Sequence, residues 1–146
     1  MRKMTVTRRK TFAACLSKLN VYIEDNIFGD TLISGVKCRR LGSIKNGESK
    51  TYEIGEGQRK VFLLADSVDT EQWNEFFTVP AGKEDVTVSG KNHLNPFEGN
   101  LFRFDGNGTD EVLRHRRRSN IYWWGVCGVT AIVGFLIALA IVLWVT

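Results

Sequence analysis

The chain has 146 residues, of which 43% are hydrophobic and 25% are charged, and its formal net charge at pH 7 is +4. Cys15, Cys38 and Cys127 are an odd number of cysteines without close spacing, which argues against a disulfide framework. The length suffices for one ordinary domain and one further segment.

The charge is unevenly distributed along the chain. Residues 1–10 contain five basic residues and no acidic one, whereas residues 11–113 contain 11 basic and 16 acidic residues, a net charge of −5. We therefore expect a basic N-terminal arm over residues 1–10, a β-rich domain over 11–110 and a basic juxtamembrane linker over 111–120. The cations lie at the ends of the chain, not among aromatic residues on a folded face, so we expect no nucleic-acid partner.

Short apolar segments separated by turn residues predict a mostly β domain, either a small sandwich or a barrel. Residues 11–18 are ambiguous and could form a helical turn. Asn46 and Gly47 predict a β-hairpin, and residues 60–65 are apolar on both faces, as in a central strand. The apolar segments cover residues 19–23, 31–38 with a bend at Gly35, 41–44, 49–54, 60–65, 73–79, 85–89 and 101–104.

Residues 121–145 contain no charged residue and no His, Pro, Asn or Gln. As a helix they would span about 37 Å, enough to cross a hydrocarbon core of about 30 Å with some tilt. Residues 11–18 are too short in apolar sequence to serve as a secretory signal, so we expect a single C-terminal transmembrane helix, the tail-anchored arrangement. Aromatic side chains at both ends of it are expected to form interfacial belts: Tyr122, Trp123, Trp124 and Trp144.

Four arginines immediately precede the apolar segment: Arg114, Arg116, Arg117 and Arg118. Basic residues beside a spanning segment are retained on the cytoplasmic side, so the N-terminal domain is expected in the cytoplasm. The same four arginines are the expected contacts to anionic lipid headgroups.

Thr130, Gly134 and Ala138 recur at intervals of four residues, on one face of the expected helix. Small residues at this spacing allow two helices to approach closely. They predict packing against another spanning helix, either from a second copy of the chain or from a partner. Chance also produces such spacings in apolar segments.

Motifs for catalysis are scarce. His93 and His115 are the only histidines, and the sequence has no Cys-x-x-Cys pair and no Gly-rich phosphate loop before a helix. We expect no catalytic residue, no cofactor and no metal site. The favoured function is an adaptor or accessory subunit whose β domain binds a protein partner at the membrane surface. The first alternative is a small subunit of a transport, secretion or envelope-assembly complex that associates through its helix, and the second is an enzyme.

Overall fold

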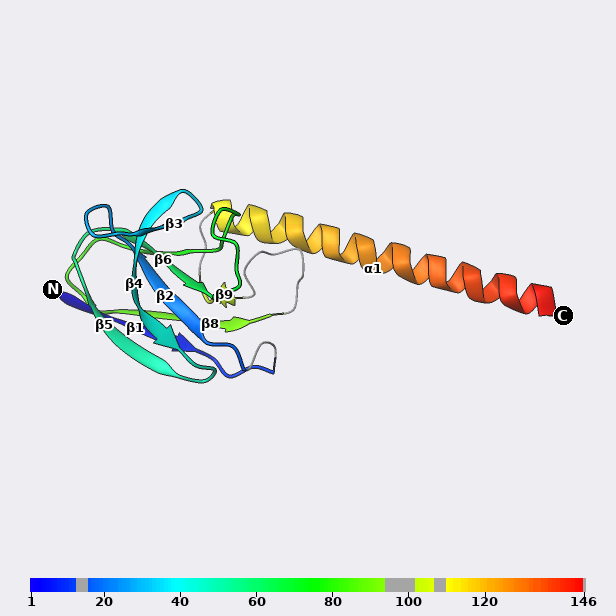
Figure 1. Ribbon diagram of the computed structural model, residues 1–146, viewed down its shortest axis with the longest axis horizontal. Helices are drawn as coiled ribbons and strands as arrows, with labels where there is room; N and C mark the ends of the chain where they lie inside the picture. The colour runs from blue at the N-terminus through cyan, green and yellow to red at the C-terminus, as the bar shows by residue number, and fades with distance from the viewer. Residues whose placement is uncertain (13–15, 94–101, 107–109, 146) are drawn as a thin grey trace.

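The computed structural model describes residues 1–12, 16–93, 102–106 and 110–145, and in these ranges nine strands precede one long helix. The strands form a domain at one end of the molecule, and the helix leads away from it (Figure 1). The predicted mostly β fold with a C-terminal helix is confirmed. The elements are β1 (Arg2–Arg8), β2 (Leu19–Glu24), β3 (Thr31–Ile33), β4 (Val36–Ile44), β5 (Ser49–Ile54), β6 (Arg59–Leu64), β7 (Phe77–Val79), β8 (Val86–Asn92), β9 (Phe102–Phe104) and α1 (Asp110–Val145).

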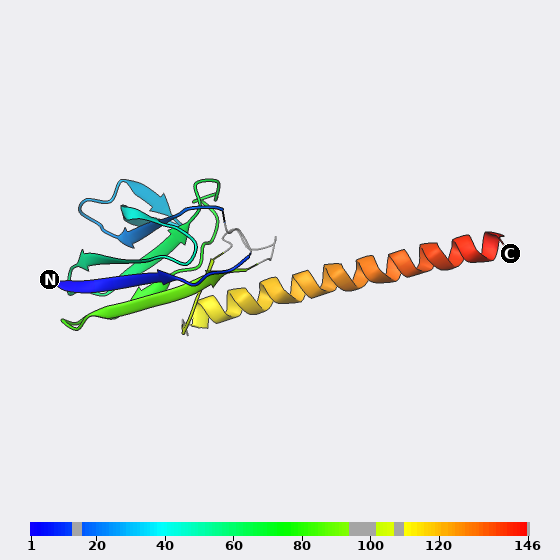
Figure 2. The same cartoon turned by 90° about the horizontal axis from the view of Figure 1, so that it is seen from below.

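The strands form two sheets, with the orders β5-β1-β8-β9 and β3-β4-β2-β6-β7. Within the first sheet β1 and β8 are parallel, and the other pairs in both sheets are antiparallel. The two sheets share one buried apolar cluster, to which the first contributes Met4, Val6, Ile54, Val88, Phe102 and Phe104, and the second Leu19, Val21, Ile23, Ile44, Val61, Leu63 and Val79. Figure 2 shows the two layers from a second direction.

Strand β6 is buried on both faces, as its continuous apolar sequence predicts. Val61 and Leu63 face the cluster between the sheets, whereas Phe62 and Leu64 belong to a second cluster on the outer face. That outer cluster also contains Val112, from the first turn of α1. The beginning of the helix is therefore part of the domain core.

The expected basic arm over residues 1–10 is instead a strand in the middle of the first sheet. Residues alternate between core and surface along β1, with Met4 and Val6 buried in the core. Arg2 and Arg8, at the two ends of the strand, are also buried. Arg8 donates to Asn92 Oδ1 (2.8 Å) and Arg2 Nε donates to the Gly55 carbonyl (3.3 Å). The charges thus satisfy buried acceptors, and the alternation beneath them is the signal of a strand.

The predicted Asn46-Gly47 turn forms, but the hairpin does not. Glu48 N donates to the Lys45 carbonyl (3.1 Å), and Gly47 has the positive φ (77°) that such a turn favours. The flanking strands β4 and β5 belong to different sheets, because β5 pairs with β1 and β4 pairs with β2 and β3. The turn therefore crosses from one sheet to the other.

The structure places the hairpin elsewhere, in the segment predicted as one bent strand over residues 31–38. β3 and β4 are antiparallel neighbours joined by Ser34 and Gly35, whose φ angles of 50° and 78° are those of a type I′ turn. The segment predicted over residues 73–79 forms a strand only in β7. Its first half instead carries side chains that contact α1.

Candidate functional site

Helix α1 is long and apolar enough to cross a membrane by length and composition. From Trp124 to Trp144 the helix rises by about 30 Å, which equals the thickness of a typical hydrocarbon core. Tyr122, Trp124 and Trp144 are exposed, whereas Trp123 is half-buried. The spacing of the predicted belts thus suits a bilayer, because exposed aromatic side chains lie at both ends of the apolar segment.

The expected linker over residues 111–120 is the docked part of α1. Its contacts recur on one helical face: Val112 is fully buried, and Ser119 nearly so. The His115 ring stacks on Trp73 at 3.7 Å between centroids, and Asn120 Oδ1 accepts from Arg103 (3.0 Å). Because these contacts extend over about two and a half turns, the helix leaves the domain in a fixed direction.

The strongest contact at this junction joins Arg116 to Glu75. The Glu75 carboxylate is buried, and both of its oxygens accept from the Arg116 guanidinium. Glu75 Oε1 also accepts from Phe104 N (2.9 Å), and Arg116 donates to the Phe104 carbonyl (2.8 Å). Arg116 therefore binds the domain, and this ion pair argues against a headgroup contact for Arg116, which stays a prediction.

The other three arginines of the basic block lie on the exposed face. Arg114, Arg117 and Arg118 are all exposed. Arg118 lies over the Tyr122 ring, 5.8 Å from its centroid. These three side chains are placed where a headgroup could reach them, and their contact with lipid stays a prediction.

The small residues Thr130, Gly134 and Ala138 lie on the exposed part of α1. A side chain added at Gly134 would meet nothing within 4 Å. Each of the three residues follows a domain-facing residue by 18 positions, or five turns: Val112, Arg116 and Asn120. The small-residue face therefore points to the same side of the helix as the domain.

Three exposed apolar side chains lie in the segment from the end of β2 to β3. Ile27, Phe28 and Leu32 are 78%, 73% and 63% exposed. Ile27 and Phe28 lie in the connection after β2, at the end of the domain away from α1 (Figure 1). Leu32 lies on the edge strand β3, whose Ile33 shares the outer cluster with Val112 of α1. We call these three residues the distal patch. Large exposed apolar surfaces on soluble domains commonly mark binding sites.

Asp25 holds the connection that carries the distal patch. Its carboxylate accepts from the backbone N–H groups of Ile27 (3.1 Å) and Phe28 (3.0 Å) and from Arg39 Nε (3.1 Å). The hydrogen bond from Phe28, with those from Ile27 and Arg39, lowers the pKa of Asp25 below its ordinary value, against the opposing effect of burial. Gly29 completes the turn, since a Cβ there would lie 2.3 Å from the Asp25 carbonyl oxygen.

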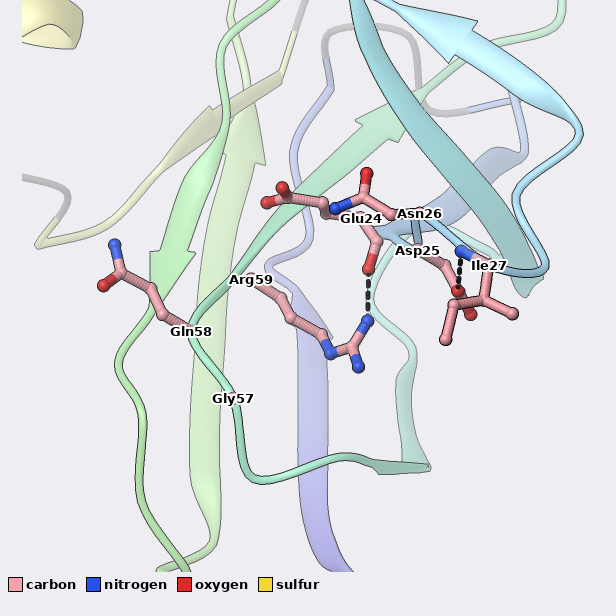
Figure 3. Close-up of a pocket in the computed structure, with 7 residues that line it drawn as sticks. All are labelled: Glu24, Asp25, Asn26, Ile27, Gly57, Gln58 and Arg59. Carbon is pink, nitrogen blue, oxygen red and sulfur yellow. Dashed lines mark hydrogen bonds between the residues drawn. The ribbon is translucent and has the colours of Figure 1, made fainter.

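A pocket of about 240 Å³ adjoins the distal patch (Figure 3). The lining residues are Glu24, Asp25, Asn26, Ile27, Gly57, Gln58 and Arg59. Arg59 Nη1 donates to the Glu24 carbonyl (2.8 Å), while its Nε is buried and has no acceptor within the described residues. The pocket thus has the Arg59 side chain in its wall, beside the apolar Ile27.

Residues with catalytic potential are placed apart. Cys38 is buried, and burial raises the pKa of its thiol to about 12, so that it stays protonated. His115 is engaged by Trp73. Within the described ranges, no group of three or more His, Cys, Asp or Glu side chains is placed to hold a metal ion.

Comparisons with protein-family models, with curated proteins and with solved structures found no match for this chain. Function has to be argued from the geometry. Sequence reasoning missed the distal patch because single apolar residues between Asp25 and Asp30 carry no periodic signal. The Asp-x-x-Phe-Gly sequence of a tight turn was the one available indication.

Proposed function

We propose that this chain is a single-pass membrane protein whose β domain faces the cytoplasm and binds a protein partner through the distal patch. The observation that carries the proposal is the separation of two apolar surfaces. One is the exposed part of α1, and the other is the distal patch, whose Ile27 and Phe28 lie at the far end of the domain.

The basic face of α1 supports the cytoplasmic orientation. Arg114, Arg117 and Arg118 are exposed just before the apolar segment, and cations in this position are retained in the cytoplasm. Protease added outside sealed right-side-out vesicles should leave the domain intact. Digestion of the domain under those conditions would refute the orientation. The tail-anchored route of insertion stays a prediction.

The docked part of α1 supports an adaptor role. About two and a half turns of contact, with Arg116 bound to the buried Glu75, keep the domain from swinging freely on its anchor. The distal patch is thereby held away from the membrane. The partner segment that fits this surface places an apolar side chain over Phe28 and a polar group in the adjoining pocket, which Glu24, Asp25 and Arg59 line.

Photo-crosslinking from position 28 in native membranes tests this surface. A benzophenone amino acid in place of Phe28 should give one dominant protein adduct, which mass spectrometry identifies. The double variant Ile27→Ser, Phe28→Ser should then weaken co-purification of that protein from full-length chain. The control is Lys83→Ser, Glu84→Ser, since both residues are exposed in another loop. Equal co-purification of both variants would refute the surface.

The alternative function, association through the helix, has one favourable observation. Gly134 is unobstructed and lies on the same face of α1 as the residues that contact the domain. A second helix packed against Gly134 would therefore lie on the domain's side of α1. Replacing residues 121–145 with a foreign spanning helix separates the two functions. The docked residues 110–120 must be kept, because they belong to the domain. Retained partner binding after the exchange supports the adaptor role, and lost binding supports the alternative.

A further inference from the structure

The connection between β1 and β2 carries the two most exposed large apolar side chains in the described part of the β domain. Phe12 and Leu16 are each 96% exposed. Neither belongs to the distal patch or to α1. Isolated exposed apolar residues are common on soluble proteins, but two in one connection, both almost fully exposed, need a reason.

Strand register places this connection at the end of the domain from which α1 leaves. Arg8, the last residue of β1, pairs with Gly90, and Gly90 pairs with Phe104, whose carbonyl accepts from Arg116. The end of β1 is therefore level with Arg116 along the helix. Arg9 N donates to the Gly90 carbonyl (2.8 Å), so the chain still follows the sheet beyond Arg8.

The next step along the register reaches the start of the apolar segment. Lys91 pairs with Arg103, and Arg103 donates to Asn120, one residue before Ile121. The chain beyond Arg9 thus runs toward the level at which α1 becomes apolar. In Figures 1 and 2 the connection lies at the helix-side end of the domain.

Lysines lie close to the two apolar residues in the sequence and on the neighbouring turn. Lys10 and Lys18 are exposed on either side, and Lys45 is exposed on the neighbouring β4–β5 turn. That turn is fixed to the connection by Asn46, which accepts from Thr11 N (3.1 Å) and donates to the Thr11 carbonyl (2.9 Å). Apolar tips flanked by lysines are the composition that binds the boundary between headgroups and acyl chains.

We propose that Phe12 and Leu16 insert into the bilayer interface, with Lys10, Lys18 and Lys45 against the headgroups, as a second membrane contact beside α1. Residues 13–15 lie outside the described residues and form no part of the site. The proposal rests on membrane insertion of α1 but not on the distal patch. With two attachment points, the domain has one fixed orientation to the membrane plane.

Lipid photo-crosslinking of the full-length chain tests the proposal. A benzophenone amino acid replaces Phe12, Leu16, Phe28 or Trp124, one at a time, in vesicles of purified phosphatidylcholine with or without phosphatidylserine. Position 28 is the matched control, an exposed phenylalanine at the far end of the domain, and position 124 reports insertion of α1. Lipid adducts are measured by mass spectrometry.

Positions 12 and 16 should give lipid adducts about tenfold above position 28, because burial of one such side chain shifts a two-state equilibrium by at least that factor. Phosphatidylserine should raise their yield, and Lys10→Ser, Lys18→Ser should remove that increase. Adducts at 124 with only background at 12 and 16 would overturn the proposal while α1 remains an anchor. No adduct at 124 would overturn both. In native membranes, a dominant protein adduct at 12 would assign these residues to a protein partner and also overturn it.

Discussion

The β domain and the apolar part of α1 use the same residue types in opposite ways. In the domain, Val61 and Leu63 are closed between two sheets, whereas Val133 and Leu136 of α1 are exposed. A domain excludes water from its apolar side chains by its own packing. The helix needs another medium to do so, and its length and composition suit a bilayer.

Residues 110–120 show that the division between the two regions is not the division between sheet and helix. They are helical, yet Val112 belongs to the outer cluster of the domain and Arg116 binds a buried carboxylate. The chemical boundary falls near Ile121, inside a continuous helix. The helix therefore continues unbroken from its domain-bound part to its exposed apolar part, and side-chain contacts mark where one part ends and the other begins.

The same substitution, Val to Asp, should impair folding in one region and membrane insertion in the other. Val61→Asp buries an unpaired carboxylate and should cost about 4 kcal/mol or more, enough to unfold the domain. Val133→Asp should leave the domain folded but disfavour insertion by about 3 kcal/mol. Far-ultraviolet circular dichroism and resistance to carbonate extraction measure the two outcomes. A folded Val61→Asp domain, or loss of the fold in Val133→Asp, would break the comparison.

Much of the domain could be predicted because its strands carry local signals. The alternation over residues 19–23 and the continuous apolar sequence over residues 60–65 both correspond to observed strands. β1 was predicted as a basic arm because arginines and lysines dominate its composition. Whether an arginine is buried depends on partners that are distant in the sequence. The pairing of β5 with β1 also depends on residues distant in sequence. A turn motif predicts a reversal of the chain but not the sheet to which the next strand belongs.

The candidate sites divide in the same way. The apolar segment of α1 could be found from composition alone, because a run of 25 residues without a charge is a one-dimensional signal. The role of Arg116 could not, since its neighbours Arg117 and Arg118 have identical local sequence character. Only the placement of Glu75, 41 residues earlier, distinguishes it.

Arg116 and Arg117 offer the sharpest test of where the domain ends. Arg116→Gln leaves the carboxylate of Glu75 buried without its cation and should destabilise the domain by about 2–3 kcal/mol, less than for a fully buried pair because Arg116 is partly exposed. Arg117→Gln should change stability little, since that side chain is exposed. Urea unfolding of the full chain in lipid nanodiscs measures both. Equal stability of the two variants would return Arg116 to the headgroup role.

Gly134→Leu tests whether the exposed helix is a plain anchor. Leu is apolar and is well tolerated in a spanning helix, so insertion should be unchanged. The added side chain should nevertheless hold a neighbouring helix away and weaken helix association by about 1–2 kcal/mol. Leu136→Ile, on the opposite face, is the control. An in-membrane association assay on residues 114–146 measures the difference. If wild type and Gly134→Leu associate equally, the small residues serve no interface and the domain alone carries partner binding.

The smallest expected effect is that acid should destabilise the connection that carries the distal patch, while α1 is unchanged. The folded-state pKa of Asp25 is lowered, chiefly by the hydrogen bond from Phe28, so its contribution to stability is complete above the ordinary value of 3.8 and is lost as pH falls through the lowered pKa.

Asp25→Asn can still accept from the two backbone N–H groups but carries no charge to titrate. The stability difference between wild type and Asp25→Asn in urea unfolding should therefore be constant from pH 7 to about pH 5 and should shrink below about pH 4. Glu48, whose pKa is lowered chiefly by the Lys45 backbone N–H, titrates in both proteins and cancels in the difference. A difference that stays constant down to about pH 2 would mean that the Asp25 carboxylate gains nothing from the folded loop, and the rigid presentation of Phe28 would lose its support.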